Sequence, residues 1–239
     1  MSTRPRIAFA DAGAQLAGVA IAGAGTLLAL DGELTAAAAG ELAGEAPAWT
    51  LAAAGAYELA LEALGEPARL ADGANVWLCR ATGAVQSRTL DGLATIVSGG
   101  AEDGVALERS VSIAFAPTLA FVLASRRPRG ARDHGEEQLE AVAFRGEPAV
   151  AAPIERPRLS TTYDAAELPR HAGIELWEGE GAELAVRIGG EAIISGELLH
   201  ADGARSRIVF MAWLHDRHHA AGSYTITTPA EPGEPPDPH

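Results

Sequence analysis

Cysteine and aromatic side chains are scarce in this chain of 239 residues. Its one cysteine, Cys79, excludes an intramolecular disulfide and a cysteine-based zinc cage. Cys79 lies in a strand-like run with no nearby histidine, so we expect it to be a small buried hydrophobe. Aromatic residues make up only 5%, and few rings are therefore available to fill a core. The near absence of thiols agrees with a reducing compartment.

Lysine and long apolar runs are absent as well. Every basic residue is an arginine, and the formal net charge is −14. So acidic a surface repels the phosphates of nucleic acids and anionic membranes. The early run "RIAFADAGAQLAGVAIAGAG" is interrupted by Asp, Gln and Gly, unlike a signal peptide, and no apolar stretch reaches the roughly 18 residues of a membrane span. We expect a cytoplasmic protein with no nucleic-acid partner and no membrane span.

The sequence does contain many short runs of strand character. Hydrophobic residues make up 48% of the chain, enough for a substantial core. "YELALEAL" alternates apolar and polar residues, which favours a half-buried strand, although a helix with two glutamates on one face also fits. Turn signals recur about every 8 to 12 residues, as in sandwiches and barrels. We predict an all-β protein with little helix, the one helical candidate being Leu34 to Leu42, "LTAAAAGEL".

Segments rich in glycine, proline and charged residues indicate the boundaries between parts of the chain. "SGGAEDG", from Ser98 to Gly104, and the charged run from Arg126 to Glu137 are both polar enough to separate β units. We place an N-terminal β unit at residues 1–100 and a C-terminal β unit at residues 101–228. The acidic, proline-rich end, residues 229–239, is expected to be a disordered tail.

The most distinctive run is "RLSTTYDAAELPRHAGIELW", from Arg158 to Trp177. Tyr163 could hydrogen-bond a ligand, and Asp164, with Tyr163 or His171, could act as an acid or base. The same residues also suit a solvated loop in which Asp164 caps a short turn. We interpret the run as a connection at the mouth of a β-barrel pocket.

Aromatic and histidine residues supply the remaining candidates. All four tryptophans fall in strand-like segments, and we choose Trp177 and Trp213 as pocket walls, with Arg158 and Tyr163 as ligand contacts. The histidines in "MAWLHDRHHAAG" have a spacing that could ligate a metal on a helix, but a polar hairpin tip explains them. Asp133 and His134 are interpreted as a charged surface loop. With no nucleotide or nucleophile motif in the sequence, we expect no cofactor and no metal.

In order and spacing, several segments resemble the carotenoid 1,2-hydratase/AttH-like superfamily, in particular small actinobacterial members. They run roughly from Tyr57 to Trp177, with a weaker match out to "GSYTI": "AYELALEALGEP", "VWLCRATGAV" followed by "RTLDGLATI", "LERSVSIAF", and "RLSTTYDAAELPRHAGIELW". The resemblance implies two lipocalin-like antiparallel β units packed side by side around a hydrophobic pocket. It also implies chemistry on apolar polyene or polyketide-type substrates without metal or nucleotide. The chain departs from the pattern after "DGLATI", where it reads "VSGGAEDG" in place of a polar and aromatic cluster.

Three functions stay open at this point. The first is binding of a small apolar molecule in a dry lumen, with Tyr163 or Arg158 orienting its polar end. The second is a hydratase, cyclase or isomerase that uses Asp164 with His171 or Tyr163. The third is a structural or interaction protein with a filled barrel. A cavity of a few hundred Å³ separates the first two from the third.

Overall fold

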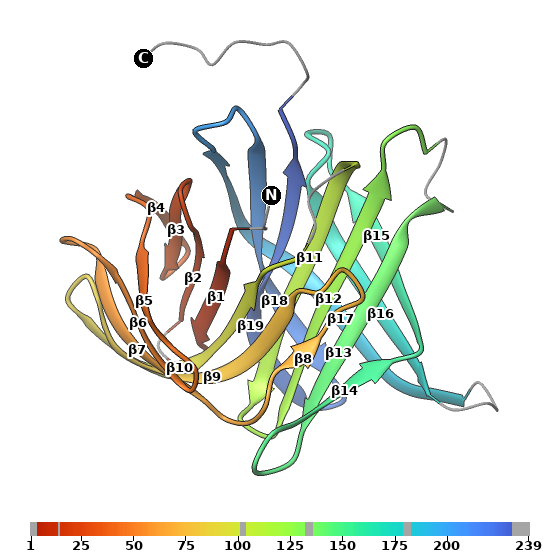
Figure 1. Ribbon diagram of the computed structural model, residues 1–239, viewed down its shortest axis with the longest axis horizontal. Coiled ribbons are helices and arrows are strands. Elements are labelled where there is room, and N and C mark those ends of the chain that lie inside the picture. Colours follow the sequence, from red (N-terminus) through yellow and green to blue (C-terminus); the bar gives the residue numbers. More distant parts are fainter. Residues whose placement is uncertain (1–3, 14, 101–103, 132–135, 179–182, 231–239) are drawn as a thin grey trace.

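Two curled antiparallel sheets form the computed structural model, which describes residues 4–13, 15–100, 104–131, 136–178 and 183–230. The two sheets lie side by side, the first coloured red to yellow and the second green to blue (Figure 1). These ranges contain no helix, and hence none long and apolar enough to cross a membrane. The segment with Asp133 and His134, and residues 231–239 of the predicted tail, lie outside the described residues.

The first sheet has ten strands, in the order β4-β3-β2-β1-β10-β9-β7-β6-β5, with β8 paired to β9. Their bounds are β1 Arg6–Asp11, β2 Leu16–Ile21, β3 Gly25–Leu30, β4 Glu33–Ala37, β5 Glu41–Glu45, β6 Ala48–Ala53, β7 Tyr57–Ala63, β8 Ala68–Arg69, β9 Asn75–Val85 and β10 Arg88–Ser98. "YELALEAL" forms β7, whose side chains alternate between buried and exposed as its sequence predicts.

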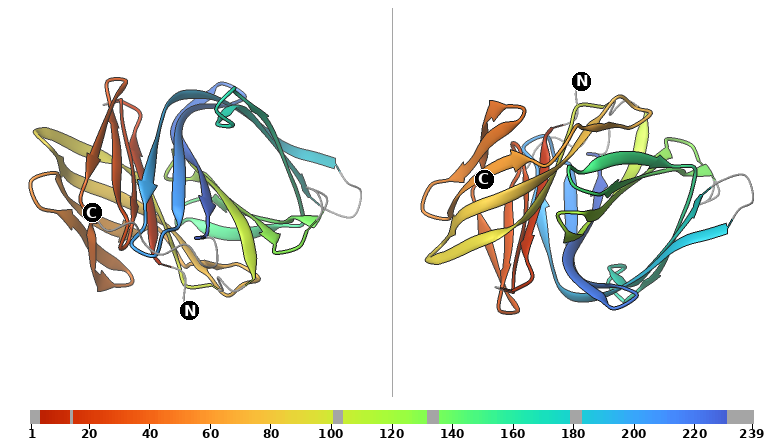
Figure 2. Two further views of the ribbon diagram at one scale, coloured as in Figure 1. Left: turned by 90° about the horizontal axis from the view of Figure 1, so that it is seen from above. Right: turned by 90° about the horizontal axis from the view of Figure 1, so that it is seen from below.

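The second sheet has nine strands, in the order β14-β13-β12-β11-β19-β18-β17-β16-β15. Their bounds are β11 Val105–Ala116, β12 Leu119–Pro128, β13 Gln138–Arg145, β14 Val150–Ile154, β15 Arg156–Tyr163, β16 Pro169–Glu178, β17 Glu183–Leu199, β18 Arg205–His215 and β19 His218–Thr228. This sheet curls until its end strand β15 contacts β13 (Figure 2). The prediction of an all-β protein with two curled units is confirmed.

The helical candidate Leu34 to Leu42 contributes to two strands and forms no helix. Leu34 lies in β4, which pairs with β3, and Leu42 lies in β5, which pairs with β6. Between them, a Cβ at Gly40 would overlap the Tyr57 hydroxyl, so this position needs glycine. The alanines favour a helix locally, but both segments find strand partners in the sheet, and sheet pairing outweighs weak propensity.

The apolar side chains form four clusters, two of which join the sheets. The first cluster lies on the concave face of the first sheet, and the second lies inside the curl of the second sheet. The third cluster packs β8 and β9 against β12 and β13, and the fourth packs β2 and β3 against β17 and β18. Two ion pairs cross the same boundary: Arg6 with Glu108 at 3.3 Å and Arg126 with Asp72 at 2.6 Å. The two curled units therefore share much of their buried surface.

Cys79 is fully buried in β9, as predicted, and we expect it to be unreactive. Burial raises the pKa of its thiol to about 12, so at pH 8 only about one molecule in ten thousand carries the reactive thiolate. Native protein should therefore resist iodoacetamide at pH 8, while protein in denaturant should be modified completely. Rapid modification of the folded protein, followed by mass spectrometry, would contradict this burial.

Candidate functional site

A cavity of about 660 Å³ lies in the second sheet, where β15 approaches β13. Its lining combines apolar and polar side chains from β11, β12, β13, β15, β16 and β19. They are Arg109, Ser125, Glu137, Leu139, Pro157, Arg158, Leu159, Ser160, Thr161, Tyr163, Gly173, Glu175 and Tyr224.

Apolar side chains fill the rest of the space that the second sheet encloses. On β11, Arg109, Val111 and Ile113 share one face because strand side chains alternate. Val111 and Ile113 belong to the buried core of this unit, whereas Arg109 reaches the cavity. Tyr224 on β19 likewise follows the phase of buried Ile226. Along these strand faces, the side chains are therefore apolar in the core and polar at the cavity.

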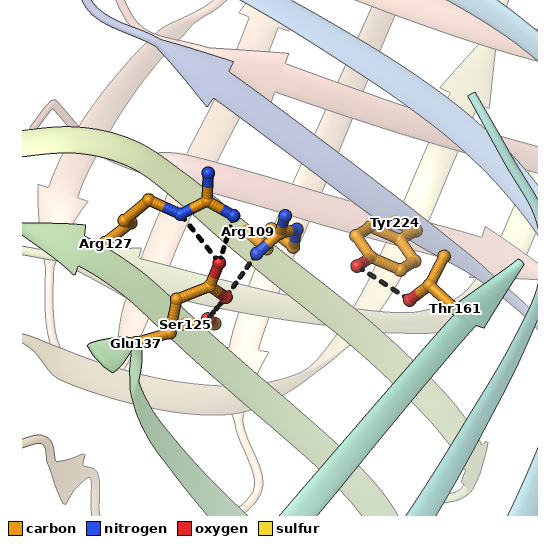
Figure 3. A network of polar contacts seen from close by, with 6 residues as sticks. All are labelled: Arg109, Ser125, Arg127, Glu137, Thr161 and Tyr224. Carbon is orange, nitrogen blue, oxygen red and sulfur yellow. Dashed lines mark hydrogen bonds and ion pairs between the residues drawn. The ribbon is translucent and has the colours of Figure 1, made fainter. Parts of the chain in front are cut away.

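Two arginines hold one buried carboxylate at the wall of the cavity (Figure 3). Arg127 on β12 donates from Nε and Nη2 to Glu137 Oε1, at 2.9 and 2.6 Å. Arg109 Nη1 and the Ser125 hydroxyl, the latter at 2.8 Å, donate to Oε2. The side chains of Arg109 and Glu137 are only 8% and 11% exposed. Burial opposes the charge of Arg109, but its hydrogen bond to Glu137 and the nearby Tyr163 and Tyr224 hold its pKa above the usual value.

A phenol faces the same compartment. The Tyr224 hydroxyl is 3.1 Å from Thr161 Oγ1 on β15, and Arg109 lies between Tyr224 and Glu137 (Figure 3). Burial raises the pKa of Tyr224 well above its usual value, and neighbouring Tyr163 raises it further, against the opposing effects of Thr161 and Arg109. Tyr224 therefore stays protonated at neutral pH and can donate a hydrogen bond.

Two of the four predicted ligand contacts line the cavity, and two do not. Tyr163 is 41% exposed and lies at the opening, while Arg158 lines the rim. Arg158 pairs in register with Glu175, on the face of β15 and β16 opposite to buried Ile174. Its guanidinium lies 5.3 Å from the ring centroid of Trp177. Trp177 therefore stacks with Arg158 on this outward face and does not form a pocket wall.

Trp213 lies in the core and not at the cavity. It is 1% exposed, in the cluster that fills the other part of the lumen. Its ring covers Gly190 and Gly222, where a Cβ would overlap the indole. Small residues on the neighbouring strands therefore leave room for the large ring.

The two other acid–base candidates are also away from the cavity lining. Asp164 begins the short loop between β15 and β16, and its Oδ1 accepts the backbone N–H groups of Ala166 and Leu168, both at 2.9 Å. This is the turn-capping role, in a loop rather than a helical turn. His171 is exposed and pairs in register with Thr162 on the outward face. Of the acid–base candidates, only Tyr163 lines the cavity.

The sequence interpretation missed Arg109, Arg127, Glu137 and Tyr224. A signal was present for three of them. In "LERSVSI", Arg109 alternates with Leu107, Val111 and Ile113, and in "SYTIT", Tyr224 alternates with Ile226. Arg127 continues the alternate positions of β12 that begin with Phe121, Leu123 and Ser125. A polar residue in the buried phase of a strand must find a buried partner or face a cavity. Glu137 gave no such signal because it lies before β13.

Other hollows and clusters in the described residues offer less chemistry. A groove of about 620 Å³ lies on β5, β6, β7 and β9, where most lining side chains are exposed. Another of about 450 Å³, between β2, β3 and β18, is lined mostly by apolar residues. His215, His218 and His219 lie at the β18–β19 hairpin, and no group of three metal-ligating side chains occurs in the part of the chain that the structure describes. Of these three hollows, the cavity beside Glu137 is the one that combines buried charges with a protonated phenol.

The fold and cavity define an all-β protein of two lipocalin-like units, and solved structures share that fold. Kievitone hydratase from Nectria haematococca superposes with a TM-score of 0.59 at 9% identity, over 96% of this chain and 89% of that chain. CghA in complex with Sch210972 gives 0.63 at 11% identity, over 98% and 89%. An AttH-like protein from Nitrosomonas europaea gives 0.59 at 10%, over 96% and 94%. No family model and no curated protein matches the sequence. Identities this low show a common fold.

Proposed function

We propose that the chain binds a small, largely apolar molecule in the cavity beside Tyr224. The observation that carries this proposal is the unfilled compartment of about 660 Å³, which is within the usual size range of ligand pockets. Leu139, Pro157 and Leu159 supply apolar wall, and each Å² of apolar ligand surface removed from water contributes about 25 cal/mol. Tyr224 and Thr161 supply hydrogen bonds that orient a polar end. The cavity favours this function over a filled barrel.

A second candidate is an enzyme that adds water to, or isomerises, such a ligand. The fold shared with kievitone hydratase supports it. So does Tyr224, whose raised pKa keeps a proton available for a substrate oxygen. Asp164 and His171 are left out of this mechanism, because neither lines the cavity. A hydration assay with kievitone, in which the product gains the mass of one water, is the first test. Tyr224→Phe should abolish turnover but weaken ligand binding only severalfold, because one hydrogen bond to the polar end is lost while the apolar contacts remain.

A matched pair of tryptophan variants tests the binding site. Thr161 points into the cavity and contacts Tyr224, whereas Thr162 is the next residue of the same edge strand and faces outward. Thr161→Trp should fill the cavity and weaken binding of the neutral dye Nile red at least about tenfold, since the bulky ring occupies the space of the ligand. Thr162→Trp should leave the affinity within about twofold. Fluorescence titration measures both.

The outcome separates this cavity from the two other hollows. Equal affinity of wild type and Thr161→Trp would place the dye elsewhere and contradict the proposed site. Equal loss in both variants would show that a tryptophan in β15 damages the sheet. Circular dichroism and thermal unfolding of both variants distinguish that result from a blocked cavity.

A further inference from the structure

A buried histidine lies where the start of the chain meets the second unit. His200 follows β17 in the turn to β18 and is only 8% exposed. Its backbone N–H donates to the Ala204 carbonyl at 2.8 Å, which closes the turn. Arg4, two residues before β1, reaches the same turn: its Nη2 pairs with Asp202 Oδ2 at 3.0 Å, and its Nη1 lies 3.5 Å from His200 Nδ1. The turn therefore joins the N-terminal segment of the first unit to the second unit.

The hydrogen-bond partners of His200 define its tautomer. An arginine has donors only, so Nδ1 of the ring accepts from Arg4. Nε2 then carries the proton and donates to the Ser206 hydroxyl at 2.8 Å, which donates in turn to Thr227 Oγ1 at 2.8 Å. Ser206 is fully buried on β18, and Thr227 lies on β19. This chain of bonds requires a neutral imidazole, because a proton on Nδ1 removes the acceptor for Arg4.

The surroundings of the ring also favour its neutral form. Burial is the largest effect and lowers the pKa of His200. Asp202, in the same turn, opposes this effect, and the positive charge of Arg4 lowers the pKa again. The strands packed on the ring contribute neutral hydroxyls, Ser206 from β18 and Thr227 from β19. The pKa of His200 is therefore held below its usual value.

Other charged side chains of the adjoining strands have partners of their own. Arg205, at the start of β18, pairs with Glu197 on β17 at 3.6 Å. Arg6 on β1 pairs with Glu108 on β11 at 3.3 Å. The charges that act on the His200 ring are therefore those of Arg4 and Asp202.

We propose that His200 is an acid-sensitive latch between the two units. Protonation of Nδ1 removes the acceptor of Arg4 and places two cations side by side, so the segment before β1 separates from the β17–β18 turn. Because the pKa is lowered by folding, the unfolded chain binds more protons than the folded one in mildly acidic solution. The latch thus stabilises the protein above about pH 6.5, the usual pKa of histidine, and this stability is lost as pH falls through the lower pKa of His200. The proposal is independent of ligand binding in the cavity.

His200→Gln, with His171→Gln as its control, tests whether this ring titrates. The introduced amide can accept from Arg4 and donate to Ser206, but it does not take up a proton. His171 is exposed on β16, so its replacement removes a histidine without touching the latch. Between pH 7.5 and pH 5.0, the melting temperatures of wild type and His171→Gln should fall by at least about 2 °C more than that of His200→Gln. Differential scanning calorimetry measures all three.

Hydrogen–deuterium exchange tests whether acid releases the segment itself. At pH 5.0, peptides covering residues 4–11 and 196–205 should exchange at least about threefold faster in wild type than in His200→Gln, whereas at pH 7.5 they should exchange equally. Comparing the two proteins at one pH cancels the intrinsic pH dependence of exchange. Arg4→Gln changes a partly exposed side chain and opens the latch at any pH, so it should exchange fast at both values.

Each outcome decides the proposal. Parallel loss of melting temperature in wild type and His200→Gln would show that His200 does not titrate, and the latch is overturned. A difference in melting temperature with equal exchange at pH 5.0 would also overturn it, since His200 is then a buried base that releases no segment. Should His200→Gln fail to fold, wild type and Arg4→Gln decide: they must differ in exchange at pH 7.5 and agree at pH 5.0, and any other pattern contradicts the latch.

Discussion

Replacing Glu137 with alanine should destabilise the protein by about 3–5 kcal/mol, because removing this carboxylate takes away the ion-pair partner of the buried Arg109. Arg109 is 8% exposed and would lose the carboxylate that accepts from its Nη1. Arg127 and Ser125 would lose the same acceptor. Urea unfolding followed by circular dichroism measures the change.

Glu197→Ala is the matched control for this variant. Glu197 also pairs with an arginine, Arg205 at 3.6 Å, but both side chains are well exposed to solvent. Exposed ion pairs contribute about 1 kcal/mol or less, so this change should have little effect. If Glu137→Ala costs no more than Glu197→Ala, the cluster is not the buried, interdependent unit that the site requires.

Trp213→Ala should cost about 3–5 kcal/mol, the range for truncating a large buried aromatic side chain. Its ring lies in the core of the second unit and across Gly190 and Gly222, neither of which can fill the space it leaves. Trp177→Ala should cost clearly less, because Trp177 is only partly buried and its stacking with an exposed arginine contributes about 1 kcal/mol or less. Thermal unfolding of both variants provides the comparison.

The same two variants separate a core role from a ligand-contact role. At a temperature where both are folded, each should bind Nile red with nearly wild-type affinity, since neither tryptophan lines the cavity. Strong loss of binding in folded Trp213→Ala, with little loss of stability, would show that Trp213 forms a pocket wall, as predicted from the sequence.

Much of the fold follows from two-residue alternation in the sequence. The β7 pattern of "YELALEAL" depends on local residues, and the strand lies where the sequence predicts it. Leu34 to Leu42 was misjudged because its strand partners, β3 and β6, decide its conformation and local propensity does not.

The site was harder to predict than the fold. Along β15 and β16, a shift of one residue moves a side chain to the other face of the sheet. Arg158 and Trp177 were grouped with Tyr163 by proximity in sequence, yet Trp177 lies on the outward face and Thr161 and Tyr163 reach the cavity. The approach of β15 to β13, which brings Thr161 to Tyr224 and closes the cavity, depends on the curl of the whole sheet.

A crystal structure of the protein soaked with 2-bromonaphthalene tests the central claim directly. The anomalous signal of bromine should lie in the hollow bounded by Leu139, Leu159 and Tyr224. Bromine found only in the apolar groove between β2, β3 and β18 would contradict the claim. A structure in which side chains of the second sheet fill the cavity would also show that it does not receive a ligand.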